Sequence, residues 1–205
     1  MVRVSILAAM NVRDQLLAAA AQVYAEGGYH GATTRRIASA AGVNEITLFR
    51  HFGSKDGLLR EALAHCHPEG AVPLPDVPHD PLGELTEWSR SHIQHLQQRA
   101  PLIRTCLGEF AERPDLVTPE MSCPVHAARA LTSYLERLQE RGLASAPFDA
   151  PTAAAMLLGA LFADAIGRDI VPDMYAAPTE EALAHYVTLF LRGIGVETSP
   201  PWGSP

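Results

Sequence analysis

The chain has 205 residues, of which 47% are hydrophobic and 19% charged, so it can bury a sizeable core in one or two domains. Its three scattered cysteines, Cys66, Cys106 and Cys123, exclude a disulfide framework and a CxxC metal pair, and they favour a reducing cytoplasm. The net charge is −7, yet the first 60 residues carry +3 and the remainder −10. A basic head on an acidic body fits a nucleic-acid-binding domain joined to a second domain, although chance asymmetry would look the same.

Targeting and membrane segments are not expected. The N-terminal residues contain no long apolar region followed by a small-residue cleavage site. The most apolar stretch, residues 153–163, is too short to span a bilayer and is closed by Asp164 and Arg168. The sequence therefore predicts a soluble, cytoplasmic protein with no membrane partner.

Nearly every segment has helical periodicity and none shows sustained apolar/polar alternation, which predicts an all-α fold. Most expected helices begin at a side chain that can accept a backbone N–H, and they end at glycine or before proline. The expected capping residues are Asn11, Ser54, Asp80, Asp149 and Thr179. The helices are expected at about residues 11–26, 33 or 34 to 42, 44–51, 54–66, 80–96, 101–113, 125–142, 149–167 and 179–194.

The prolines of residues 68–81 predict a semi-rigid linker, because each proline removes a donor and clashes with a preceding helical turn. We therefore place one domain at residues 11–60 and a second helical domain at residues 61–196. The tail, residues 197–205, is expected to be disordered. No internal repeat is found.

The most informative stretch is residues 33–59, TTRRIASAAGVNEITLFRHFGSKDGLL. Apolar side chains such as Ile37, Leu48 and Phe52 allow two short helices to pack at a steep angle. Gly42 lies where the turn between them needs a residue that tolerates positive φ. The exposed positions are polar or basic, and the two helix N-termini favour anions. This spacing predicts a helix-turn-helix, although two short amphipathic helices joined by glycine give the same pattern in unrelated proteins.

The segment from Asn11 to Leu63 resembles the DNA-binding domain of the TetR family of repressors. The family pattern joins Gly-Gly-aromatic, Thr-Thr, I-A-x-x-A-G-V and T-L-[YF]-x-[HY]-F-x-S-K-x-x-L-L. This chain reads GGYHGATTRRIASAAGVNEITLFRHFGSKDGLL. The resemblance implies a three-helix DNA-binding domain followed by a helical ligand-binding and dimerisation domain. It implies a ligand-responsive transcriptional regulator, expected to be a repressor, that binds a pseudo-palindromic DNA operator as a homodimer.

The resemblance also implies roles for individual positions. Phosphate contacts are expected from Thr34, Thr47, Phe49, Arg50, His51 and Lys55. Base contacts are expected from Arg35, Asn44, Glu45 and Ile46. Phe49 departs from the family pattern, which usually has a phosphate-binding tyrosine there. Without the hydroxyl this contact is reduced to packing or lost, and Arg50 beside it is the candidate substitute.

In the C-terminal half the resemblance implies a dimer interface and an effector pocket. Residues 153–167 are apolar nearly all round and need cover on more than one side, although a monomer core would also provide it. The expected interface residues are Met156, Leu157, Leu161, Leu183, Val187 and Phe190. The expected pocket residues are Trp88, His92, Ile93, Leu96, Ile103, Cys106, Phe110 and Tyr134. They would suit a largely apolar small molecule with one hydrogen-bonding group, but they could equally fill the core.

Other chemistry is weakly supported. His65-Cys66-His67 suggests a metal site, but adjacent helical residues point in different directions and no further ligand has useful spacing, so no metal is expected. No cofactor motif, nucleophile elbow or glycine-rich phosphate loop is present. The rival interpretation is an all-helical enzyme whose N-terminal helices are only structural. Sequence-specific DNA binding would separate the two.

Overall fold

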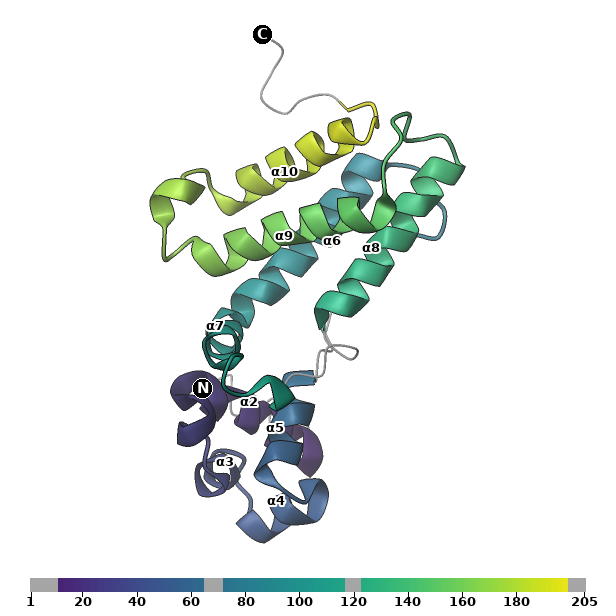
Figure 1. The fold of residues 1–205 in the computed structure, drawn as a ribbon. Coiled ribbons are helices and arrows are strands. Elements are labelled where there is room, and N and C mark those ends of the chain that lie inside the picture. The colour runs from purple at the N-terminus through teal and green to yellow at the C-terminus, as the bar shows by residue number, and fades with distance from the viewer. Residues whose placement is uncertain (1–10, 65–71, 117–122, 199–205) are drawn as a thin grey trace. The chain divides into compact units, whose positions relative to one another are not determined.

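The computed structural model describes residues 11–64, 72–116 and 123–198. These ranges contain helices, turns and bends but no strand, so the all-α prediction is confirmed (Figure 1). The helices form two compact units, each with its own core. We call α2 to α5, α7 and η1 the head unit, and α6, α8, α9, η3 and α10 the body unit.

The head unit is built from short helices around α2. Its elements are α2 (Val12–Gly31), α3 (Thr34–Ala40), α4 (Glu45–Phe52), α5 (Lys55–Ala64), α7 (Ala100–Glu109) and the 3₁₀ turn η1 (Pro114–Leu116). Helix α2 packs against α3, α5 and α7, and α4 packs against α3 and α5. The head therefore includes a segment, α7–η1, that lies well beyond the predicted domain of residues 11–60.

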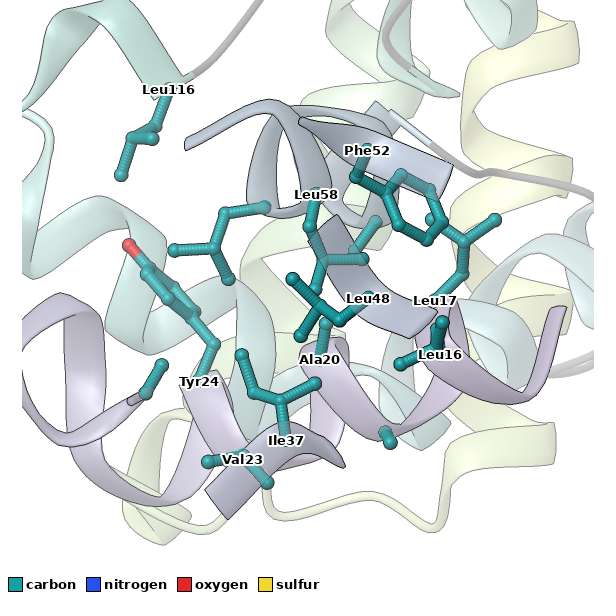
Figure 2. Close-up of a cluster of buried hydrophobic side chains, with 14 of the residues drawn as sticks. Leu16, Leu17, Ala20, Val23, Tyr24, Ile37, Leu48, Phe52, Leu58 and Leu116 are labelled. Atoms are coloured by element: carbon teal, nitrogen blue, oxygen red, sulfur yellow. The ribbon is translucent and has the colours of Figure 1, made fainter. Parts of the chain in front are cut away.

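One apolar core holds the head unit together (Figure 2). Helix α2 contributes a face repeating every three or four residues, and α3, α4, α5 and η1 each add one or more side chains to it. Burial of each large side chain stabilises the fold by about 1.5–3 kcal/mol. The labelled members are Leu16, Leu17, Ala20, Val23, Tyr24, Ile37, Leu48, Phe52, Leu58 and Leu116.

The body unit consists of longer helices. Its elements are α6 (Pro81–Gln98), α8 (Cys123–Glu140), α9 (Ala150–Gly167), the 3₁₀ turn η3 (Pro172–Tyr175) and α10 (Thr179–Gly193). Helix α6 packs against both α9 and α10, which lie side by side (Figure 1). The carboxylate of Asp164, fully buried in α9, accepts hydrogen bonds from Arg168 at 2.6 and 2.7 Å and from the Tyr186 hydroxyl at 2.9 Å. Arg168 also donates to the carbonyls of Tyr175 and Ala177, so it fastens the α9–α10 connection to the end of α9.

Four of the five predicted caps are confirmed. Asn11, Ser54, Asp80 and Asp149 each accept a backbone N–H from three residues further on, at 2.9–3.1 Å. The prediction for Thr179 is wrong, because Pro178 occupies the capping position and Thr179 is the first helical residue. Helix α2 also continues past its predicted end, although Gly28 has a non-helical φ of 62° inside it.

Two features set aside in the sequence reappear in the structure. Helix α9 is longer than the apolar stretch 153–163 and, by length and composition alone, is apolar enough to cross a membrane. It packs on α6 and α10, however, so one of its sides lies in the core of the body unit. Across residues 11–64, 72–116 and 123–198, no group of three or more His, Cys, Asp or Glu side chains could hold a metal ion. His65, Cys66 and His67 lie outside these ranges.

Candidate nucleic-acid interface

The sequence of α3 and α4 explains the steep turn between them. Thr33 caps α3 by accepting the N–H of Arg36 at 3.2 Å, and Asn44 caps α4 by accepting the N–H of Ile46 at 2.9 Å. Between the two caps, Gly42 has a φ of 70°, as the turn requires. Ile37 and Leu48 are completely buried in the core of the head unit, which turns the opposite faces of both helices outward.

The outward face of α3 and α4 carries basic and apolar side chains. Arg35, Arg50 and His51 are exposed. Ile46 is 75% exposed and Phe49 47%, so both side chains are accessible to a partner. Together with two helix N-termini, this surface can attract phosphate and offers apolar contacts to base edges.

Besides Asn44, three predicted DNA contacts have side-chain partners within the chain. The Thr34 hydroxyl donates to Glu45 Oε1 at 2.6 Å, which joins a predicted phosphate contact to a predicted base contact. The Lys55 ammonium donates to the carbonyl oxygen of Tyr29. Burial lowers the pKa of Lys55, and the positive charge of Arg113 lowers it further. The carboxylates of Asp56 and Glu109 have the opposite effect on this pKa. Thr47, the remaining predicted phosphate contact, is partly exposed on α4.

A polar cluster that the sequence pattern does not reveal lies next to this surface. Tyr29 is half-buried, and its backbone N–H donates to both oxygens of Glu109 in α7, at 2.9 and 3.0 Å. Its hydroxyl donates to Asp56 Oδ1 at 2.7 Å, and Arg113 lies over its ring. The only signal in the sequence was the aromatic residue after Gly-Gly, because Glu109 is 80 residues away.

The predicted effector residues are divided between the two units. In the body unit, Trp88 and His92 stack with ring centroids 5.1 Å apart and planes 3° apart, and the Tyr134 hydroxyl donates to Glu84 at 2.6 Å. Ile93 and Leu96 are buried in the same unit. Ile103, Cys106 and the exposed Phe110 belong instead to the head unit, on or next to α7.

The predicted dimer residues are placed mostly inside the body unit. Leu157, Leu161, Leu183 and Val187 are at most 2% exposed, so packing on α6 leaves them no surface that a partner could cover. Within the single chain these four are core residues, and their role in a dimer stays a prediction. Phe190 is half-exposed, and Met156 is 68% exposed.

Comparison with known proteins identifies the head. Residues 16–62 match the family model described as bacterial regulatory proteins, tetR family. The uncharacterized HTH-type transcriptional regulator YvkB of Bacillus subtilis is 28% identical over 185 residues, covering 89% of this chain and 97% of that protein. A crystal structure of a TetR-family regulator from Mesorhizobium loti superposes with a TM-score of 0.69 at 21% identity, over 90% of this chain and 97% of that one.

Residues 16–62, within the head unit, form a helix-turn-helix domain of the TetR family. This domain is the DNA-binding part of a helix-turn-helix transcriptional regulator. The HTH-type transcriptional repressor AcnR of Corynebacterium glutamicum is 44% identical over 48 residues, which cover 23% of this chain and 26% of AcnR. The relatives are transcriptional regulators, which favours regulation over the rival enzymatic interpretation.

Proposed function

We propose that this TetR-family regulator is a ligand-responsive repressor that binds a pseudo-palindromic operator as a homodimer in the cytoplasm. The observation that carries the proposal is the outward face of α3 and α4, where Arg35, Ile46 and Arg50 project from a well-capped helix pair. Repression rests on the family resemblance alone, because the short matches to the head include both the repressor AcnR and the transcriptional activator FasR of Mycolicibacterium smegmatis. Helix α4 would lie in the major groove, and the two heads of a dimer would occupy successive grooves about 34–36 Å apart.

Within that surface we assign two kinds of contact. Phosphates would be held by Thr47, Arg50, His51 and Lys55 and by the backbone N–H of Thr34, whose hydroxyl hydrogen is engaged by Glu45, with the ring of Phe49 packing on the sugar-phosphate. Base edges would be read by Arg35, Asn44, Glu45 and Ile46. The exposed Ile46 suits the methyl group of thymine, and Arg35 suits guanine.

Dimer formation would use the surface of α9 and α10 that the chain leaves uncovered. Met156 on α9 and Leu189 on α10 are both more than half exposed. Phe190, which follows Leu189 in sequence, is partly exposed. Helix α9 adds small exposed residues, Ala155, Gly159 and Ala163, which allow a second helix to approach closely. A second copy of this chain offers the same self-complementary face, as a two-fold interface requires.

The effector would bind in the body unit near α6. Burial lowers the pKa of His92 to about 4, so at neutral pH its ring is uncharged and can both donate and accept a hydrogen bond. Ser89 Oγ on the same helix is fully buried and has no hydrogen-bond partner among the described residues. A buried hydroxyl without a partner needs a ligand or water. Trp88 supplies apolar area, so we expect a largely apolar effector with one hydrogen-bonding group.

Selection of genomic fragments by the purified protein at physiological salt tests DNA recognition. We expect an enriched pseudo-palindrome whose affinity falls steeply with salt, because phosphate contacts release counterions. Arg35→Ala should weaken the preferred site by about 1–3 kcal/mol and relax one base position. Retention of no enriched duplex would overturn the assignment. Deletion of the gene should raise transcription from the selected promoters, and a fall would make the protein an activator.

A further inference from the structure

Tyr29 occupies a break in helix α2. Gly28 has φ 62° and ψ −166°, so the N–H of Tyr29 leaves the helical ladder and donates to both carboxylate oxygens of Glu109. The approach is close, because a Cβ on Gly28 would lie 2.1 Å from Glu109 Oε1. Glu109 is the last residue of α7, so the end of α7 is attached directly to the break.

The other side of Tyr29 faces the start of α5. The Lys55 ammonium lies 3.7 Å from the centroid of the Tyr29 ring and also donates to the Tyr29 carbonyl oxygen. Arg113 Cζ lies 3.8 Å from the same centroid, and its guanidinium is 3.5 Å from Asp56. The Tyr29 hydroxyl donates to Asp56, the neighbour of Lys55. One residue thus joins α7 and its following turn to the first two residues of α5.

This arrangement restricts a side chain that is otherwise flexible. A free lysine has a flexible four-carbon stem and loses rotamer entropy when it is fixed. The Tyr29 carbonyl uses one of the three ammonium donors, which leaves two for a phosphate oxygen. A lysine that is already ordered loses less entropy on binding and binds more tightly.

We propose that Tyr29, held by Glu109 and Arg113, is a positioning residue that orders the Lys55 ammonium for an operator phosphate, so that α7 controls this DNA contact without touching DNA. The inference rests on the proposed function, since it needs Lys55 to meet a phosphate. It assigns to Glu109 and Arg113, which lie 57 or more residues beyond the end of α4 in sequence, a role in DNA affinity.

The first experiment needs no DNA. Lys55 is the only lysine of the chain, so reductive methylation with ¹³C-formaldehyde labels Lys55 and the N-terminal amine alone. The two signals separate on titration, because the α-amino group titrates near pH 8 (roughly 7.7–8.0). Ring-current shielding should move the Lys55 methyl signal upfield in the full-length wild type. Tyr29→Phe should keep this shift, because it retains the ring and the carbonyl.

Glu109→Ala should return the Lys55 signal toward that of a free lysine, while Glu112→Ala should leave it unchanged. Glu112 is exposed on the same segment and carries the same charge, which makes it the matched control. Glu109→Gln, which preserves the size of the side chain, replaces Glu109→Ala if that variant fails to fold. A Lys55 signal without ring-current shift in the wild type, or one indifferent to both Glu109 variants, would overturn the proposal.

The second experiment is a double-mutant cycle on the selected operator. Glu109→Ala should weaken binding about fivefold relative to Glu112→Ala, since only preorganisation is lost. In a Lys55→Ala background the same change should have no further effect, because Glu109 acts through Lys55. Additive losses would overturn the positioning role. A wild type that retains no duplex would overturn the proposed function itself, which the methyl signal does not depend on.

Discussion

The hydrogen bond from Thr34 to Glu45 has a consequence for base recognition. It engages Glu45 Oε1 at 2.6 Å and leaves the other carboxylate oxygen as an acceptor at the N-terminus of α4. In the major groove only cytosine and adenine offer amino donors, and adenine places the acceptor N7 beside its amino group. A carboxylate therefore favours cytosine, so we expect a cytosine in each half-site opposite Glu45.

Glu45→Gln tests this expectation directly. Glutamine both donates and accepts, and pairs with the N6 and N7 of adenine, so the preferred base should change from cytosine to adenine. The change should be worth about 1–3 kcal/mol at that position, measured by competition between duplexes that differ only there. Glu112→Gln, which alters the charge of the head equally, should leave the preference unchanged. An unaltered cytosine preference in Glu45→Gln would show that Glu45 does not read the base.

His92 predicts how stability depends on pH. Burial, with a smaller contribution from His95, lowers its pKa from 6.5 to about 4. The contribution of neutral His92 to the free energy of unfolding is therefore complete above pH 6.5. It is lost as the pH falls through 4, because the unfolded chain takes up the proton first. The loss in the free energy of unfolding should be at most about 3 kcal/mol.

Urea denaturation at pH 7 and pH 4.5, followed by fluorescence of the neighbouring Trp88 in a Trp202→Phe background, measures this loss. His92→Gln should remove much of the pH dependence. His126, which is exposed on α8, provides the matched control, and His126→Gln should behave like the wild type. Equal acid sensitivity of the wild type and His92→Gln would place the titrating group elsewhere.

At the scale of elements, two glycines with positive φ allow the cost of backbone strain to be measured apart from the cost of a steric clash. Gly42 has φ 70° with no atom within 4 Å of an added Cβ, whereas Gly28 has φ 62° and a Cβ there would meet Glu109. Gly42→Ala should destabilise the head by about 1–2 kcal/mol through strain alone. Gly28→Ala should cost more, because its φ and ψ together are almost restricted to glycine and the Glu109 carboxylate must also move. Thermal unfolding of the two variants compares their stabilities. Equal losses of stability would mean that Glu109 and the end of α7 can move away from an added Cβ at no cost.

The same elements explain what could be predicted from the sequence. Caps such as Asn11 and Asp149 depend on a hydrogen bond three residues away, so the local pattern is sufficient. The positive φ of Gly42 likewise follows from the turn between two short helices. The attachment of Glu109 at Tyr29 joins residues 80 positions apart and leaves no local pattern. For α9, apolar nearly all round, periodicity could not separate the face with Leu161 in the core from the face with Met156 outside.

At the scale of the whole molecule, chain connectivity links the two units. Helix α7 and η1 belong to the head, yet in sequence they lie between α6 and α8 of the body. The hydrogen bond between Glu109 and the backbone N–H of Tyr29 lies at the C-terminal end of α7.

The uncovered face of α9 and α10 gives the last prediction, which concerns assembly. Substitution of Leu161, which is fully buried, would unfold the body unit and would not report on a partner. Met156 is 68% exposed in the single chain, so Met156→Glu should leave the fold and thermal stability of the protomer intact. In a dimer it would bury an unpaired carboxylate, which is strongly unfavourable. Sedimentation should therefore show fewer dimers at a given concentration. Operator affinity should fall in parallel, because recognition of two half-sites depends on the pair.

Met174 supplies the matched control for this substitution. It is 73% exposed and lies in η3, outside the face shared by α9 and α10. Met174→Glu changes the charge and the apolar surface equally, so it should dimerise and bind the operator like the wild type. A further variant, Leu189→Glu on α10, should behave like Met156→Glu, since Leu189 is 59% exposed on the other helix of the pair. A wild type that sediments as a monomer at the concentration where it binds its operator would refute the dimer. Loss of dimer in Met174→Glu but not in Met156→Glu would move the interface to the α9–α10 connection.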